Sequence, residues 1–193
     1  VYSQSGEIKA AMPYVVAEAE KLGYKLDRMA VAGGSAGGCL ALIYAYRDAD
    51  TSPVPVRMMF EAVGPGSFRV EDWGIYGLDQ SPEAAANLFS AMSGTMLTPE
   101  DIISGAYLEA VKPISADRWV TKDTVPSVLC YGAHDKVQPF AASKTLVAAL
   151  KENGVDYQYF VAEHSGHGLQ NDSKVYMEYL DTVVEYLDKY MSE

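Results

Sequence analysis

Four short apolar segments alternate along this chain with segments of helical character. The apolar segments are residues 28–33, 56–63, 125–132 and 156–162, and helix-forming stretches follow the first, third and fourth of them. This alternation predicts a mostly parallel sheet with helices on both faces, a three-layer α/β/α sandwich. Ligands of such sheets bind at the carboxyl ends of the strands, so the loops after these segments are the first place to search for chemistry.

The helices are expected from their spacing and their end signals. Apolar residues from Ile8 to Leu22 repeat at helical intervals before Gly23, and a last helix is predicted from about Asp172. Residues 66–112 differ, because two Ser-Pro or Thr-Pro pairs, at residues 81–82 and 98–99, predict two short capped helices there. We therefore expect one domain over residues 1–193, with a small helical insert at about 66–112.

Composition narrows the class of protein. Of the 193 residues, 49% are hydrophobic and 21% charged, which is typical of a globular chain, and the net charge of -11 argues against nucleic acid as a partner. No apolar run is long enough to cross a bilayer, and Cys39 and Cys130 lie in apolar runs as buried free thiols would. Because the chain starts at Val1, we expect residues to precede it, and the compartment stays open with the cytoplasm favoured.

The first apolar segment leads directly into Gly33-Gly34-Ser35-Ala36-Gly37, a G-x-S-x-G match between a predicted strand and a predicted helix. A serine hydroxyl is a poor nucleophile, and a sharp turn with small neighbours exposes its oxygen at the end of a strand. The helix that follows directs its N-terminal N–H groups at the same point, where they favour developing negative charge. No G-x-G-x-x-G and no Gly-Lys pair accompany these glycines, so nucleotide binding is disfavoured.

A nucleophilic serine needs a base and a carboxylate, and both types of residue follow the later segments. Asp135, preceded by His134, comes after the third segment, and His164 and His167 come after the fourth. One of these two histidines could meet Ser35 and Asp135 above the sheet, whereas Asp172 is the alternative carboxylate or a helix cap. The His-x-x-His spacing could also suggest a metal site. Ser165 and Gly166 between the histidines disfavour the helix that would place both on one face, so this interpretation is disfavoured.

These motifs resemble the α/β-hydrolase fold, particularly serine esterases and lipases of the acetyl-esterase and hormone-sensitive-lipase type. The resemblance also covers Lys112-Pro113-Ile114-Ser115, the stretch from Val125 to Pro139, and Ser165-Gly166-His167-Gly168-Leu169. It implies that Ser35 is the nucleophile, Asp135 the acid and His167 the base, and that Ala36 supplies an oxyanion-hole N–H. It further implies a small carboxylic ester as substrate and no cofactor or metal.

The resemblance has a part that this chain does not match. Such hydrolases normally place several strands and an HGG-type oxyanion motif before the nucleophile, and no such motif precedes Ser35. We expect either a fragment of a larger hydrolase or a homo-oligomer that covers the exposed edge of strand 28–33. The insert resembles a small lid over an acyl pocket, with an ordinary core as the alternative; its apolar residues are Phe68, Trp73, Tyr76, Phe89, Met92 and Met96.

Two rival functions stay open at the level of sequence. A peptidase of the prolyl-oligopeptidase type shares these motifs and would act on a proline-containing peptide amide. A hydrolase remnant that binds without catalysis would keep Ser35, Asp135 and His167 but lack a competent oxyanion hole.

Overall fold

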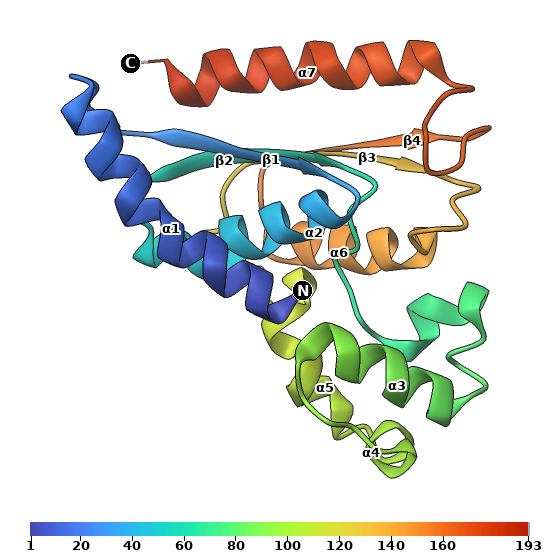
Figure 1. The fold of residues 1–193 in the computed structure, drawn as a ribbon. Helices are drawn as coiled ribbons and strands as arrows, with labels where there is room; N and C mark the ends of the chain where they lie inside the picture. Colours follow the sequence, from blue (N-terminus) through green and yellow to red (C-terminus); the bar gives the residue numbers. More distant parts are fainter. Residues whose placement is uncertain (193) are drawn as a thin grey trace.

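The computed structural model describes residues 1–192 and contains a parallel four-stranded sheet (Figure 1). The strands lie side by side in chain order, and they are β1 (Met29–Gly34), β2 (Val56–Ala62), β3 (Ser127–Gly132) and β4 (Tyr157–Ala162). Each predicted strand is present with small shifts of its ends. β3 is buried along its whole length, because it pairs on both sides and helices cover both of its faces.

Two helical layers enclose the sheet, as predicted. Helices α2 (Ala36–Ile43) and α6 (Phe140–Glu152) pack on one face, and α7 (Ser173–Met191) lies along the other (Figure 1). Each layer has its own core. Leu42, Leu129 and Leu146 are buried on the α2 and α6 side, and Val128, Tyr179 and Val183 are buried between the sheet and α7. Within residues 1–192 no helix is long and apolar enough to span a membrane.

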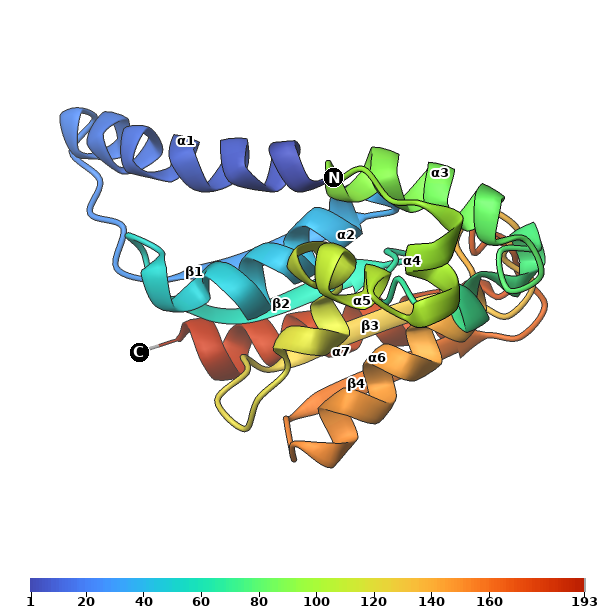
Figure 2. The same cartoon turned by 90° about the horizontal axis from the view of Figure 1, so that it is seen from below.

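The insert, residues 66–112, lies on the α2 and α6 side of the molecule (Figure 2). Both predicted caps are present: Ser81 starts α3 (Pro82–Ser93), and Thr98 starts α4 (Pro99–Ser104) through a capping box with Asp101. The insert also holds a short 3₁₀ segment (Val70–Tyr76) and α5 (Tyr107–Val111), which the sequence did not predict.

The large apolar side chains of the insert differ in their surroundings. The rings of Phe68, Trp73 and Phe89 are buried and pack against one another. Met96, by contrast, is exposed. At least three of these residues therefore form an ordinary core between short helices.

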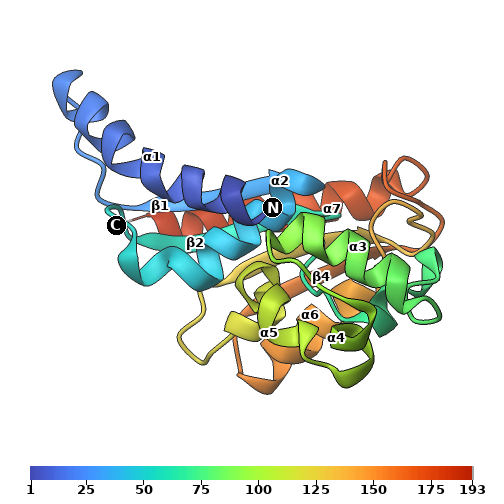
Figure 3. The ribbon, with the colours of Figure 1, turned by 60° about the horizontal axis from the view of Figure 1, so that its bottom comes forward.

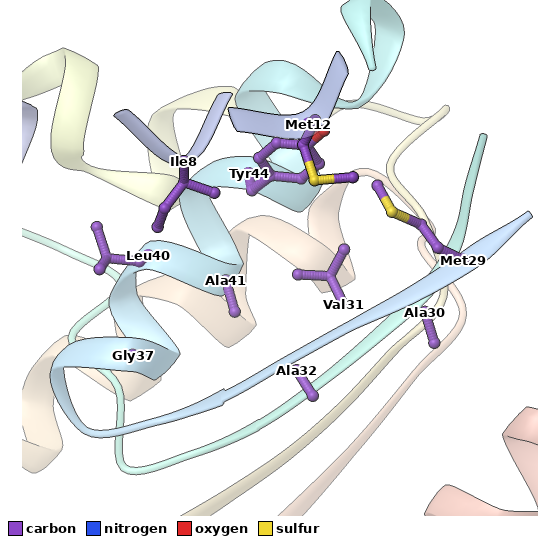
Figure 4. A pocket seen from close by; sticks show the side chains of 10 residues that line it. All are labelled: Ile8, Met12, Met29, Ala30, Val31, Ala32, Gly37, Leu40, Ala41 and Tyr44. Carbon is purple, nitrogen blue, oxygen red and sulfur yellow. The ribbon is translucent and has the colours of Figure 1, made fainter. Parts of the chain in front are cut away.

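The first helix, α1 (Tyr2–Lys21), lies beside the β1 edge, and its C-terminal end extends away from the sheet (Figures 2 and 3). The helix is where the sequence predicts it. Within the described residues, however, Ser5 is the one residue of α1 that is buried, and the apolar residues of the helix are not. An apolar groove of about 400 Å³ separates α1 from the sheet, and it is bordered by Ile8, Met12, Met29 and Val31 (Figure 4). The apolar stripe of α1 is thus not packed against the sheet.

Candidate active site

The turn after β1 holds Ser35 in a conformation that few residues adopt. Its φ is 54° and its ψ is -125°, so residue 35 has a positive φ although it is not glycine. The Ser35 N–H donates to the carbonyl of Ala62 at 2.9 Å, which continues the pairing of β1 with β2. The strand-turn-helix setting that the motif predicts is therefore present.

The glycines around Ser35 have different roles. A Cβ added at Gly33 would lie 2.2 Å from the carbonyl oxygen of Gly37, so the backbone can double back only if residue 33 is glycine. A Cβ at Gly37 would meet nothing within 4 Å. Gly38 is the second glycine that close packing requires, because a Cβ there would lie 2.8 Å from the Glu61 carboxylate. The sequence motif assigned this steric role to both Gly33 and Gly37; the structure requires it of Gly33 but not of Gly37, and it adds Gly38.

The imidazole of His167 lies between Ser35 and Asp135. His167 Nε2 is 2.8 Å from Ser35 Oγ, and His167 Nδ1 is 2.8 Å from Asp135 Oδ2. The Asp135 side chain is 1% exposed and that of His167 is 28% exposed, so the carboxylate is screened from water while the ring reaches the surface. The structure thus brings together three residues that are far apart in the chain, with the imidazole between the hydroxyl and the carboxylate.

The loop after β3 fixes the Asp135 carboxylate on its other side. Oδ1 accepts the backbone N–H groups of Val137 at 2.7 Å and Gln138 at 2.9 Å. These two bonds hold the carboxyl group in place and leave Oδ2 directed at His167.

The loop after β3, which carries Asp135 and is called the acid loop below, is also joined to the loop that carries His167. The His134 N–H donates to the carbonyl of Ser165 at 2.9 Å, and a Cβ at Gly132 would lie 2.3 Å from the carbonyl oxygen of Gly166. The two loops can approach this closely only because Gly132 has no side chain. The His134 side chain itself is exposed, as expected of a residue beside the acid.

His164 and Asp172 belong to a separate hydrogen-bonded group. His164 Nδ1 is 2.9 Å from Asp172 Oδ1, and Asp172 Oδ2 accepts the His164 N–H and the Ser165 hydroxyl. The adjacent carboxylate raises the pKa of His164, whose ring is largely exposed. Asp172 occupies the position before α7, as predicted, but its side chain makes no capping bond and holds the histidine loop instead.

The two histidines therefore face different carboxylates, His164 the Asp172 side chain and His167 that of Asp135. Within residues 1–192 no group of three His, Cys, Asp or Glu side chains is gathered as a metal site.

The two cysteines, Cys39 and Cys130, are buried free thiols, as predicted, and burial raises the pKa of each to about 12.

Ala36, the expected oxyanion donor, is the first residue of α2 and directly follows Ser35. N–H groups in the first turn of a helix have no acceptor within the helix, and the helix dipole favours an anion beside them. The position of Ala36 is consistent with the role that the sequence resemblance gives it.

Two residues beside this group were not singled out from the sequence: Gln138, whose N–H donates to Asp135, and Glu61, a fully buried carboxyl on β2. Tyr76, named above as a residue of the lid-like insert, donates its hydroxyl to the carbonyl of Val137 at 2.7 Å. A charged residue within the apolar run at 56–63 was the one signal that could have drawn attention to Glu61.

The fold and the three converging loops define a protein of the α/β-hydrolase type. The family model BD-FAE matches residues 3–150, and the chain belongs to this family. No curated protein matches the sequence.

Solved structures with this fold include several esterases. A thermophilic esterase from Thermogutta terrifontis is 20% identical with a TM-score of 0.66, and 94% of this chain aligns with 61% of it. An acetyl ester-xyloside bifunctional hydrolase from Caldicellulosiruptor lactoaceticus is 21% identical with a TM-score of 0.62, over 94% of this chain and 63% of that one. Esterase B from Lactobacillus rhamnosis is 18% identical with a TM-score of 0.67, over 96% and 61%. The chain thus spans less than two thirds of the length of these three structures.

Proposed function

We propose that this protein is a serine hydrolase that cleaves small carboxylic esters. The observation that carries the proposal is the His167 ring, whose two nitrogens lie 2.8 Å from Ser35 Oγ and 2.8 Å from Asp135 Oδ2. A ring held in this way has its Nδ1–H on the carboxylate and its Nε2 lone pair on the hydroxyl. It is therefore ready to accept the serine proton.

In the first half of the reaction, Ser35 Oγ attacks the ester carbonyl while its proton passes to His167 Nε2. Asp135 stabilises the imidazolium, and the negative carbonyl oxygen is held by the Ala36 N–H at the start of α2. His167 then gives the proton to the leaving alkoxide, and the acyl group stays on Ser35. In the second half, water takes the place of the alcohol: His167 removes its proton, the carboxylic acid leaves, and Ser35 regains its hydrogen.

The substrate class is supported by the structural neighbours. The Thermogutta terrifontis esterase was solved with propionate bound and with butyrate bound, and the Caldicellulosiruptor lactoaceticus enzyme is described as acting on an acetyl ester. We therefore propose esters of short acyl chains.

A fluorophosphonate probe and p-nitrophenyl esters test this function together. The Thermogutta terrifontis esterase was solved phosphonylated by sarin, so a related fold reacts with such phosphorus electrophiles. We expect the probe to label Ser35 with loss of fluoride, and we expect Ser35→Ala and His167→Ala to abolish both labelling and hydrolysis of the acetate and butyrate esters. His164→Ala is the matched control, since its ring contacts Asp172 and should leave labelling unchanged.

The outcomes also separate the rival functions. Cleavage of a proline-containing peptide amide without cleavage of either ester would indicate a peptidase. Absence of labelling in the folded wild-type protein would contradict the proposal and favour a binding module.

A further inference from the structure

Glu61 is a buried acid next to the proposed site that the reaction above does not use. Its side chain extends from β2 under the first turn of α2, where a Cβ on Gly38 would lie 2.8 Å from Glu61 Oε2. Oε2 accepts the backbone N–H of Gly64 at 2.7 Å. Within residues 1–192, Oε1 has no hydrogen-bond partner. Burying a carboxyl group that is not fully hydrogen-bonded lowers the stability of the fold, so a structural or functional role is expected for this residue.

The surroundings of Glu61 favour the neutral acid. Burial raises its pKa to about 8, and within the described chain no positively charged side chain pairs with it. The titratable groups that sense its charge are themselves neutral at pH 7, because burial raises the pKa of each; they are Cys39, Tyr46, Cys130, Tyr131, Tyr159 and Tyr179. At neutral pH the residue therefore acts through hydrogen bonding and shape.

The peptide group of Gly64 connects Glu61 to the acid loop. Its N–H donates to Glu61, and its carbonyl accepts the Tyr131 hydroxyl at 2.8 Å and Gln138 Nε2 at 3.5 Å. The backbone N–H of Gln138 in turn donates to Asp135 Oδ1. A continuous buried path thus runs from Glu61 to the carboxylate that orients His167.

The same peptide also contacts the nucleophile helix. A Cβ on Gly64 would lie 2.6 Å from the carbonyl carbon of Gly38, so α2 rests directly on this turn. The preceding residue, Val63, has a φ of 52°, which is a strained conformation for a β-branched residue. A turn of this kind keeps its shape only when neighbouring bonds hold it, and the Glu61 carboxyl supplies one of them.

We propose that Glu61 is a positioning residue of this site: through the Gly64 turn it sets the spacing between the first turn of α2, which follows Ser35, and the loop that carries Asp135. The inference rests on the proposed function, since it assigns a purpose to that spacing. It also has a consequence for pH. Once Glu61 ionises, its negative charge lies beneath the helix turn that would stabilise the oxyanion, and the rate falls.

The test compares two substitutions at Glu61 with a control. Glu61→Gln keeps an oxygen that can accept the Gly64 N–H but cannot ionise, and Glu61→Leu keeps the bulk but leaves that N–H unpaired. Asp117→Asn is the matched control, a buried acid whose pKa is raised to about 6 and whose side chain contacts Arg69 instead of the Gly64 turn. The readouts are the rate of Ser35 labelling by a fluorophosphonate from pH 6 to pH 9.5, and the downfield proton resonance of His167 Nδ1, assigned with His167→Ala.

We expect the labelling rate of wild type to fall above about pH 8. We expect Glu61→Gln to label at the wild-type rate at pH 7 and to lack this fall. We expect Glu61→Leu to label about tenfold more slowly and to lose or shift the His167 resonance, because one unpaired buried donor is sufficient for such a change. Asp117→Asn should follow wild type in both readouts.

Two results would overturn the assignment: wild-type labelling and an unchanged resonance in Glu61→Leu, or an alkaline fall in rate that persists in Glu61→Gln. If Glu61→Leu does not fold, the pH profile of Glu61→Gln decides alone. If wild type is not labelled, the proposed function fails. The His167 resonance then tests the role of Glu61 independently of labelling. A resonance that is kept in Glu61→Gln and lost in Glu61→Leu supports the positioning role.

Discussion

The same strand, β1, borders two very different regions of this molecule. At its carboxyl end, hydrogen bonds and close glycine contacts hold Ser35 in place, and a buried acid lies under the helix that follows. Along its free side lies the apolar groove beneath α1, and Val15, farther along α1, is exposed. The site end is built for fixed distances, whereas the free side presents an apolar surface and an open strand edge.

This difference indicates where the chain tolerates change. Groups at the carboxyl end are constrained by several neighbours at once, so a small displacement spreads to the reacting atoms. Groups on the free side have few neighbours within residues 1–192, so substitutions there should alter association more than activity.

The largest effect is expected from adding one methyl group in the turn at Ser35. In Gly33→Ala the new Cβ would lie 2.2 Å from the Gly37 carbonyl oxygen, so the turn must open and Ser35 Oγ must move from His167. We expect ester hydrolysis to fall by about 10²-fold or more, since a displacement of about 1 Å has such an effect. Gly37→Ala is the control, because nothing lies within 4 Å of its Cβ. Equal activity of the two variants, measured with p-nitrophenyl acetate, would contradict the fixed geometry.

The next effect concerns stability and comes from Glu61. Its pKa is raised from an ordinary 4.5 to about 8, so between these values the unfolded chain releases a proton that the folded chain keeps. The free energy of unfolding must therefore fall as pH rises across this interval and become level above it.

Glu61→Gln removes this dependence, because glutamine does not titrate. Relative to wild type, we expect the variant to gain stability between pH 5 and pH 8, by an amount on the order of a few kcal/mol. Urea unfolding at the two pH values measures this gain, and all other titrating groups cancel in the difference. Parallel pH curves for the two proteins would show that Glu61 is ionised in the folded state at neutral pH.

A smaller effect is expected at the free edge of β1, which we propose pairs with a second copy of the chain. The N–H groups of Met29 and Ser35 donate toward β2, so by alternation those of Ala30 and Ala32 point away from it. Ala32→Pro removes one outward donor without removing a bond to β2, and it should raise the dimer dissociation constant by at least about tenfold. Ala32→Thr keeps the N–H and serves as the control in sedimentation velocity runs. A wild-type protein that is monomeric at every concentration would contradict this pairing.

Much of the site end could be predicted from sequence because local chemistry specifies it. The apolar runs predicted the strands. The positions of Ser35, Asp135 and the pair His164 and His167 after three of those runs predicted that a serine, a carboxylate and one histidine could meet, and the family resemblance selected His167. The role of Glu61 could not be predicted, because it depends on how closely β2, α2 and the Gly64 turn approach one another. Asp172 shows the same limit, since its position before α7 was correct while the partners of its side chain were set by a tertiary contact.

The free side was predicted less well for a different physical reason. An apolar stripe on a helix predicts burial, but it does not specify the surface that buries it. In α1 the stripe from Ile8 to Leu22 is present, and Val15 is 50% exposed.

The smallest effect is therefore expected from Val15→Gln. Because the Val15 side chain has few neighbours in the described chain, its substitution should change the free energy of unfolding by no more than about 0.5 kcal/mol. Val183→Gln is the matched control: Val183 lies on the face of α7 that packs against the sheet and is 5% exposed, so the same change there should cost a few kcal/mol through lost burial and an unpaired amide. Urea titrations at low and high protein concentration distinguish two explanations of any larger effect at Val15. A loss that appears only at high concentration would mean that association buries the α1 stripe, whereas a loss at every concentration would mean that α1 packs against its own chain more closely than the groove allows.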